Sequence, residues 1–275
     1  KASPTLTHSF TFIINEEEKC KDKTPFLVLL ISTRAAELQH RNAIRRSWGK
    51  EAVVPGVAVV RLFMLGIEAT GASEDVLLQE SQQYRDIIQQ DFLDTYNNLT
   101  LKTLMGMRWV ASYCSGTRFA MKTDSDVFVN TVYLIEKLLR PLPPPTLNYF
   151  TGHLMTDSSP IRNKTSKWYI SEEEFPGNRF PPFCSGTGYI FSGDLAAKIV
   201  RASLMIKYIH LEDVYVGLCL KAMGVEIEPS DHSLFNMYKV YFSPCMYNRL
   251  ITSHRIKPHE HILYWETVQA KKHRC

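Results

Sequence analysis

Two aspartates separated by one residue, Asp124 and Asp126, directly follow a segment at 119–123 that is expected to be a strand. On an extended or turning backbone, residues i and i+2 can direct both carboxylates to one cation. Two carboxylates and a diphosphate together offer the hard oxygen ligands that Mg²⁺ and Mn²⁺ prefer. A surface turn gives the same short pattern, but the apolar residues that flank it, ending with 127–129, disfavour that alternative. We therefore expect a divalent-cation site at these aspartates.

A second acidic pair, Glu212 and Asp213, stands where a helix is expected to begin, because apolar residues follow at Val214, Leu218 and Ala222. Carboxylates at a helix N-terminus are favourable whatever the function, so helix capping is one interpretation. The other is that one carboxylate is a general base that accepts a proton from a hydroxyl group.

A glycine-containing segment at 183–189 is the third candidate. Gly186, Thr187 and Gly188 would let the backbone approach a ligand closely, although a tight turn explains the composition equally well. Trp168 and Tyr169 could stack on sugar rings, but buried aromatic residues are the commoner case.

Two further side chains fit either a functional or a structural role. His254 is a ligand only if the fold brings it to the aspartates, since a hydrogen-bonded histidine is the more common finding. Arg45, next to Arg46, faces either a phosphate or solvent.

Strands and helices alternate over the first 140 residues. We expect strands at 26–31, 57–65, 87–88 and 119–123, and helices at 37–48, 73–84, 99–113 and 131–140. This alternation predicts an α/β fold with a mostly parallel sheet. Ligands of such sheets bind outside the carboxyl ends of the strands, which is where Asp124 and Asp126 stand.

The second half of the chain is more mixed. We expect strands at 149–154 and 189–191, a loop at 156–167, and helices near 193–203, 213–223 and 258–271. No repeat and no linker separates the halves, so a single domain is predicted after an N-terminal arm or edge element at 1–24.

Composition excludes several classes of protein. The chain has 275 residues, is 45% hydrophobic and 22% charged, and carries a net charge of +4, which is typical of a folded globular protein. Its only basic cluster lies at 271–274, so a nucleic-acid interface is not expected. No apolar run is long enough to cross a bilayer.

Six cysteines permit up to three disulfides with 15 possible connectivities, and Cys20–Cys114 and Cys219–Cys245 are the pairs we test. No C-x-x-C pair occurs, which disfavours a structural zinc site. Free thiols in a cytosolic protein are the alternative. Two N-x-S/T sequons, at Asn98 and Asn163, lean toward a lumenal protein, although about one is expected by chance.

Five long motifs in this order resemble the β-1,3-glycosyltransferase family (glycosyltransferase family 31). They cover residues from about 25 to the C-terminus and are Arg41-x-Ala43-Ile44-Arg45-x-Ser47-Trp48-Gly49, Asp94-x-Tyr96-x-Asn98-Leu99-Thr100-x-Lys102-Thr103, Lys122-Thr123-Asp124-Ser125-Asp126-Val127-Phe128-Val129-Asn130, Pro181-Pro182-Phe183-Cys184-Ser185-Gly186-Thr187-Gly188-Tyr189 and Glu212-Asp213-Val214-Tyr215-Val216-Gly217.

The resemblance implies a GT-A fold, in which a Rossmann-like nucleotide-sugar half (about 25–130) and an acceptor half (about 131–275) share one central, mostly parallel sheet. Residues 1–24 would be a stem remnant or an arm. It also implies a type II membrane protein of the Golgi lumen, anchored by a segment that precedes this chain, with possible homodimers.

The same resemblance implies roles for individual residues. Asp213 would be the catalytic base. The Mn²⁺ or Mg²⁺ ligands would be Asp124, Asp126 and His254. Residues around the UDP-sugar donor would be Ser32, Thr33, Arg34, Arg45, Lys102, Asp124 and Ser125. Residues that contact the donor or acceptor sugar would be Trp168, Tyr169, Gly186, Thr187, Gly188 and Glu212.

Within the family, the motifs are most similar to the β-1,3-galactosyltransferases, which implies inverting transfer of galactose from UDP-galactose to the 3-hydroxyl of a terminal N-acetylglucosamine. The N-acetylglucosaminyl branch tends to carry three consecutive aspartates, whereas Ser125 occupies the middle position here. Transfer of N-acetylglucosamine, a metal-dependent hydrolase and an inactive glycan-binding or chaperone module remain the alternatives.

Overall fold

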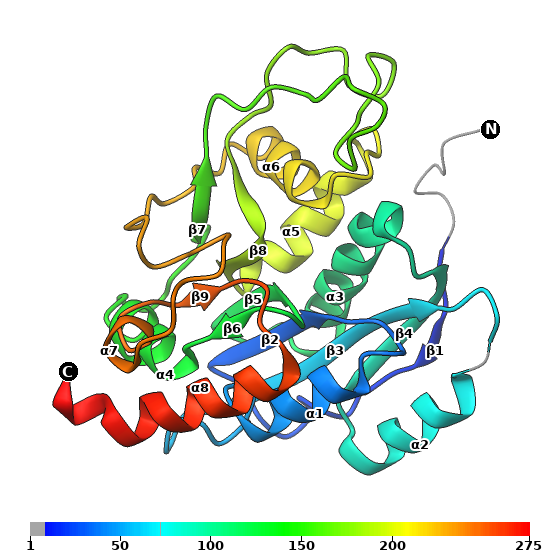
Figure 1. The fold of residues 1–275 in the computed structure, drawn as a ribbon. Coiled ribbons are helices and arrows are strands. Elements are labelled where there is room, and N and C mark those ends of the chain that lie inside the picture. The colour runs from blue at the N-terminus through cyan, green and yellow to red at the C-terminus, as the bar shows by residue number, and fades with distance from the viewer. Residues whose placement is uncertain (1–8, 72) are drawn as a thin grey trace.

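One seven-stranded sheet organises the computed structural model, which describes residues 9–71 and 73–275 (Figure 1). Its strand order is β1-β4-β3-β2-β5-β8-β7. The bounds are β1 (Phe12–Ile14), β2 (Leu27–Ser32), β3 (Val59–Ile67), β4 (Ile87–Leu93), β5 (Phe119–Asp124), β7 (Phe150–Met155) and β8 (Phe183–Ser192). Strands β4, β3, β2 and β5 are parallel, and the remaining pairings are antiparallel. The α/β class and the mostly parallel central sheet are confirmed.

Helices cover both faces of this sheet. On one face, α1 (Leu38–Arg46) packs against α8 (Pro258–Lys271), and on the other α3 (Leu99–Tyr113), α5 (Asp194–Ser203) and α6 (Glu212–Ala222) pack together (Figure 1). The other helical segments are α2 (Glu74–Tyr84), η1 (Tyr96–Asn98), α4 (Thr131–Tyr133), the π-helical η2 (Leu134–Leu139), α7 (Pro244–Tyr247) and η3 (Lys272–Arg274).

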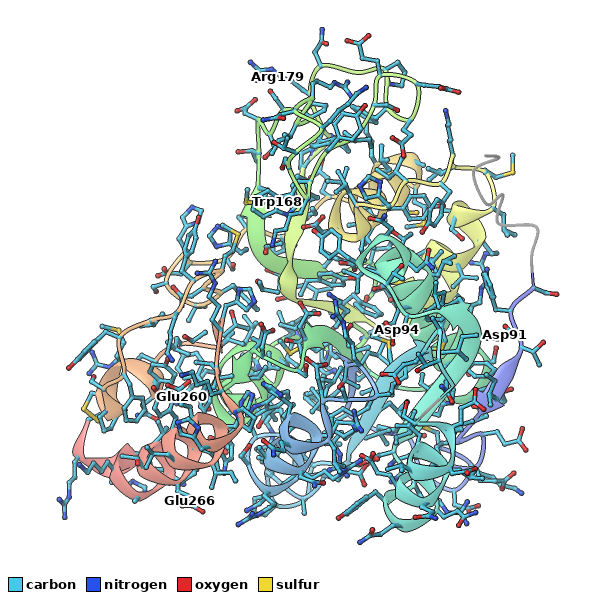
Figure 2. All side chains as sticks on the ribbon, turned by 45° about the vertical axis from the view of Figure 1, so that its right-hand side comes forward. Asp91, Asp94, Trp168, Arg179, Glu260 and Glu266 are labelled. Carbon is cyan, nitrogen blue, oxygen red and sulfur yellow. A yellow bond between two sulfur atoms is a disulfide. The ribbon has the colours of Figure 1, made fainter. Side chains whose placement is uncertain are left out.

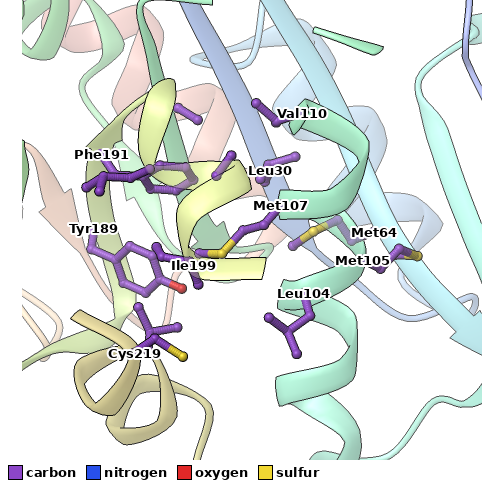
Figure 3. Packing of buried hydrophobic residues seen from close by; sticks show 14 of the residues in the cluster. Leu30, Met64, Leu104, Met105, Met107, Val110, Tyr189, Phe191, Ile199 and Cys219 are labelled. Carbon is purple, nitrogen blue, oxygen red and sulfur yellow. The ribbon is translucent and has the colours of Figure 1, made fainter. Parts of the chain in front are cut away.

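The apolar run at 26–31 becomes the central strand β2 because both of its faces are covered. Val28 and Leu30 contribute to the core beneath α3, whereas Leu27, Leu29 and Ile31 contribute to the core beneath α1 and α8. Figure 3 shows α3 packed on the first of these cores. A Cβ at Gly106 of α3 would lie 2.4 Å from the Met64 sulfur, so glycine permits this close helix–sheet approach.

A small second sheet pairs β6 (Phe128–Val129) with β9 (Thr252–Ser253). Ser253 lies opposite Phe128, and the N–H of Ile256 donates to the carbonyl of Asp126 at 2.8 Å. This pairing brings the segment that carries His254 to the end of β5.

The predicted N-terminal arm contributes an edge strand. Residues 12–14 form β1 and pair with β4, while residues 1–8 of the predicted stem remnant lie outside the described residues. A disulfide between Cys20 and Cys114, as expected, ties this arm to the residue that follows α3.

The expected Cys219–Cys245 disulfide is wrong, because Cys245 pairs with Cys275 and Cys219 is a buried free thiol. Cys219 lies on α6 in the core on one face of the sheet. Cys245 lies on α7, which packs against α8 on the other face. The central sheet therefore separates the two residues.

The sheet also places the two predicted halves in direct contact, because β5 pairs with both β2 and β8. Strand order reverses around β2, with β3 and β4 on one side and β5 on the other. Such a switch point leaves a crevice at the carboxyl ends of the two central strands. Ser32 and Asp124 are opposite each other at this end. Within the described residues, no helix is long and apolar enough to cross a membrane.

Candidate active site

Asp124 and Asp126 lie where β5 ends, at the switch point of the sheet. The N–H of Ser125 donates to the carbonyl of Ser32 at 2.9 Å, and that of Val127 donates to the carbonyl of Asp124 at 3.1 Å. The turn is thus fixed to the end of β2. The side chains of Asp124 and Asp126 are 31% and 42% exposed, so both are accessible to a ligand.

His254 is brought to Asp126, as expected. Its Nε2 lies 3.2 Å from Oδ2 of Asp126, and its Nδ1 lies 2.9 Å from the carbonyl of Met237. Burial works against the charged form of Asp126, but the contact with His254 outweighs it and lowers the pKa of that carboxyl. The same hydrogen bond raises the pKa of His254.

The surroundings of His254 fit a cation site. Because a carbonyl only accepts, Nδ1 must carry a hydrogen, and a neutral ring then presents the lone pair of Nε2 to Asp126. Two acceptors face each other there unless a proton or a cation lies between them. A second ring nitrogen bonded to a backbone carbonyl is also typical of histidines that bind metals.

Protein side chains alone do not complete a cation site. No group of three His, Cys, Asp or Glu side chains in the described part of the chain is arranged to hold a metal ion. A cation at Asp126 and His254 would need further ligands from a bound molecule, and diphosphate oxygens are suitable.

Asp124 faces a buried lysine. Its Oδ1 accepts a hydrogen bond from Nζ of Lys122 at 3.0 Å. Burial raises the pKa of Asp124, and Lys122 opposes that shift. Burial would lower the pKa of Lys122 itself, but Asp124 and Glu212 outweigh it, so the pKa is raised and the ammonium stays charged.

Glu212 does not face a sugar site, which corrects the expected role. Glu212 is only 6% exposed. Its Oε1 accepts hydrogen bonds from the hydroxyl of Tyr189 at 2.5 Å and from the hydroxyl of Thr103 at 3.1 Å. Its Oε2 lies 3.5 Å from Nζ of Lys122. Both carboxylate oxygens are therefore occupied inside the protein.

Asp213, next to it, is half-buried at the N-terminus of α6. Oδ1 accepts from the N–H of Val214 at 2.9 Å, and Oδ2 accepts from the N–H of Gly186 at 3.2 Å. Burial raises the pKa of this carboxyl, while the two N–H groups and Lys122 oppose the shift. An aspartate that is held in one orientation and remains accessible suits a general base.

The loop after β2 reaches the same place. The carboxylate of Glu37 accepts from the N–H of Arg34 at 2.7 Å and from the hydroxyls of Thr33 and Ser125, each at 3.2 Å. Ser32, through its carbonyl, also binds the Ser125 N–H. Ser32, Thr33, Arg34 and Ser125 thus lie together beside Asp124, but of these four only Arg34 is exposed, while the other three are buried.

Lys102 lies beneath this loop. Its Nζ donates to the carbonyl of Thr33 at 2.8 Å and pairs with Asp94 at 2.7 Å, and its side chain is 2% exposed. Burial lowers the pKa of Lys102, and Asp94 opposes the shift. Lys102 therefore supports the loop from inside the protein, and its ammonium is not exposed to make the expected donor contact.

Arg45 does not reach the site, so the expected donor contact is wrong. Its guanidinium forms ion pairs with Glu80 and Asp86 at 2.7 and 2.8 Å and is 6% exposed. The ring of Tyr84 covers it, with a centroid distance of 3.9 Å. Buried ion pairs with a stacked arginine explain this residue without a ligand.

The segment with Gly186, Thr187 and Gly188 is part of strand β8, not a tight turn. Gly186 and Thr187 are half-exposed, but Gly188 is buried, and a Cβ there would lie 3.0 Å from the side chain of Thr252. A direct sugar contact is therefore open only to the first two.

Trp168 lies where the 156–182 segment returns to the body of the protein, whereas Arg179 lies at its outer end (Figure 2). Trp168 is 49% exposed, and Nζ of Lys167 lies 4.6 Å from its ring centroid and 5.9 Å from that of Tyr96. Tyr169 is half-buried, and no contact places it at the aspartates.

Tyr96 connects this aromatic group to the carboxylates. Burial and the charges of Asp213, Asp124 and Glu212 raise the pKa of Tyr96 to about 12. The hydroxyl therefore stays protonated at neutral pH, at the edge of the site.

The two sequons differ in accessibility. Asn163 is exposed, and its Oδ1 accepts from the N–H and hydroxyl of Thr165 at 3.1 and 2.9 Å. Asn98 is half-buried, and its Nδ2 donates to the carbonyl of Leu93 at 2.8 Å.

Sequence reasoning assigned no role to Lys122, Glu37, Tyr96 or His261, all of which lie in or beneath the site. Nε2 of His261 donates to the carbonyl of Ser125 at 2.9 Å, and its Nδ1 accepts from the indole N–H of Trp48 at 3.0 Å. Lys122 and Tyr96 stand inside the motifs quoted above, which was the available signal. Glu37 and His261 carry no such signal.

Comparisons with known proteins bear on the family to which this chain belongs. A family model described as galactosyltransferase matches residues 39–231. β-1,3-Galactosyltransferase 2 of Mus musculus is 53% identical over 270 residues, which cover 97% of this chain and 64% of that protein. β-1,3-Galactosyltransferase 1 of Mus musculus is 50% identical over 276 residues, which cover 100% of this chain and 84% of that protein.

A solved structure, the galactosyltransferase LgtC in complex with donor and acceptor sugar analogues, aligns with a TM-score of 0.44 and 10% identity over 88% of this chain and 95% of that one. A likeness at this level supports no functional inference. The family match and the two relatives cover most of the chain at high identity. The chain therefore belongs to the galactosyltransferase family of β-1,3-glycosyltransferases, glycosyltransferase family 31.

Proposed function

We propose that this protein transfers galactose from UDP-galactose to the 3-hydroxyl of a terminal N-acetylglucosamine on a glycan and forms a β-1,3 linkage. The observation that carries the proposal is the convergence of Asp126 and His254 with Asp213 around the switch point of the sheet. Family membership and relatives named β-1,3-galactosyltransferases support the sugar and the linkage.

The donor would lie at the ends of β2 and β5. The exposed Arg34 would be available to the diphosphate, and the buried Ser32, Thr33 and Ser125 would support the loop that carries it. Asp126 and His254 would hold Mn²⁺ or Mg²⁺, with Asp124 beside them. The bound cation supplies charge neutralisation for the diphosphate leaving group.

The acceptor would approach from the side of α6 and the 156–182 segment. Asp213 would take the proton from the acceptor 3-hydroxyl as its oxygen attacks the anomeric carbon on the face opposite UDP. One carboxylate suffices for a single displacement, which turns an α-linked donor into a β-linked product. Trp168 and Tyr96 would border the acceptor, since aromatic rings stack on the apolar faces of sugars.

We further propose that the protein acts in the lumen of the Golgi apparatus. Two disulfides, Cys20–Cys114 and Cys245–Cys275, support an oxidising compartment. The exposed sequon at Asn163 is compatible with glycosylation there.

A donor and acceptor screen tests the proposal. Purified protein is incubated with UDP-galactose or UDP-N-acetylglucosamine, with N-acetylglucosamine-terminated or galactose-terminated acceptors, in Mn²⁺ or in chelator. We expect product only with UDP-galactose, the N-acetylglucosamine acceptor and Mn²⁺, and a β-1,3 linkage by NMR. Absence of sugar transfer under every condition, or an α-linked product, would refute the proposal.

A further inference from the structure

The ammonium of Lys122 joins three elements beneath the candidate active site. Its side chain is 3% exposed, and Nζ lies 3.0 Å from Oδ1 of Asp124, 2.6 Å from the carbonyl of Gly186 and 3.5 Å from Oε2 of Glu212. These partners belong to β5, β8 and α6. The Lys122 ammonium therefore links the strand that carries Asp124 to the strand and helix that lie beside Asp213.

The peptide of Gly186 continues this connection. Its carbonyl accepts from Lys122, and its N–H donates to Oδ2 of Asp213 at 3.2 Å. A Cβ at this position would lie 2.9 Å from Oε2 of Glu212, so the absence of a side chain lets β8 approach so closely. A continuous chain of polar contacts therefore runs from Asp124 through Lys122 and Gly186 to Asp213.

The charges give this connection rigidity. Glu212 cannot turn away from Lys122, because its other oxygen is held by Tyr189 and Thr103. Breaking a buried ion pair by removing one partner is strongly unfavourable, because the other charge is left uncompensated. These contacts therefore hold the Lys122 ammonium between Asp124, Gly186 and Glu212.

We propose that Lys122 is a positioning residue that sets where Asp213 stands relative to Asp124, and so aligns the base with the acceptor hydroxyl while the donor is held on the other side. Lys122 contacts no substrate and acts through Gly186. The inference rests on the proposed function and extends it to a residue outside the reacting groups.

Two reactions of the same donor separate a positioning role from a structural one. Transfer to the acceptor needs Asp213 in line with one hydroxyl, whereas hydrolysis of UDP-galactose by water tolerates many approach directions. In Lys122→Met we expect transfer to fall about 100-fold, the low end of general-base effects, and hydrolysis to fall less than about 10-fold. An equal fall in both reactions, or unchanged transfer, would overturn the proposal.

A double variant keeps the test decisive if Lys122→Met folds poorly. Lys122→Met with Glu212→Gln removes both charges of the buried pair, so thermal stability should recover relative to Lys122→Met alone. Transfer should remain low, because Asp124 and the carbonyl of Gly186 still lack the Lys122 ammonium that contacts them in the wild type. Recovery of transfer together with stability would show that Lys122 only neutralises Glu212, and would overturn the proposal.

Lys19 offers a matched control. It is a half-buried lysine that is also paired, with Nζ 2.9 Å from Glu51 and 2.7 Å from the carbonyl of Arg85, and it lies outside the site. Lys19→Met should lower stability and leave the ratio of transfer to hydrolysis unchanged. A wild-type protein that transfers no sugar would refute the proposed function. If the wild type is active and Lys122→Met has the same ratio of transfer to hydrolysis as the wild type, only this inference is refuted.

Discussion

Replacing Asp213 by asparagine separates catalysis from folding. The variant keeps the shape of the side chain and removes its ability to accept a proton. In the structure, one carboxylate oxygen accepts from the N–H of Val214 and the other from the N–H of Gly186. Asparagine retains one oxygen and therefore loses one of these two hydrogen bonds, at a cost of about 0.5–1.5 kcal/mol in stability.

The expected catalytic loss is larger. General-base assistance contributes about 10²–10⁴ in rate, which corresponds to about 2.7–5.4 kcal/mol of activation free energy. We therefore expect Asp213→Asn to fold, to bind UDP with Mn²⁺ like the wild type, and to lose at least about 100-fold in kcat. Steady-state transfer assays measure kcat, and calorimetry measures UDP binding.

Asp194→Asn is the matched control, because Asp194 also begins a helix, α5, and its carboxylate also accepts a backbone N–H, that of Asn148. It lies outside the site, so its variant should turn over like the wild type. Near-normal turnover of Asp213→Asn, or an equal loss in both variants, would refute the assignment of Asp213 as the base.

Three further variants test other parts of the structure. Asp126→Ala should abolish Mn²⁺-dependent binding of UDP, and calorimetry that shows unchanged affinity would contradict its role as a ligand. Cys245→Ser opens the disulfide to Cys275, whose partners are 30 residues apart, and should lower the free energy of unfolding by about 3–4 kcal/mol, as chemical denaturation would measure. Glu260→Gln tests pH dependence: burial opposes ionisation, but hydrogen bonds, first that from Lys239, outweigh it and lower the pKa of Glu260 from 4.5 to about 2. Its carboxylate therefore stabilises the fold above pH 4.5, so the stability deficit of the variant at neutral pH should shrink as the pH falls toward 2, and a deficit independent of pH would contradict this.

The sequence predicted elements well where apolar runs were long. The helix expected at 99–113 is α3 with the same bounds, and the strand expected at 119–123 is β5 with one more residue. The strands β6 and β9 were missed because two residues give no periodicity to detect, and β1 was expected only as an arm or edge element without bounds. The glycines at 186 and 188 hid the first half of β8, since glycine argues against a strand by propensity.

The sequence predicted several residues that belong to the site, but it did not predict which of the motif residues are exposed to a ligand. Asp126 and His254 meet as expected, although far apart in the chain. Arg45 and Glu212 stand in equally long motifs, yet both are buried in ion pairs. A charged residue in a motif can face a ligand or hold the scaffold, and burial, which decides between them, is a tertiary property.

The pairing of β6 with β9 has a consequence for biosynthesis. During synthesis the parallel strands emerge first, and His254 emerges only with the last part of the chain, inside the loop that Cys245 and Cys275 close. A nascent chain therefore holds Asp126 before His254 has been synthesised. The contact between these two side chains forms only when almost the whole chain is available to fold.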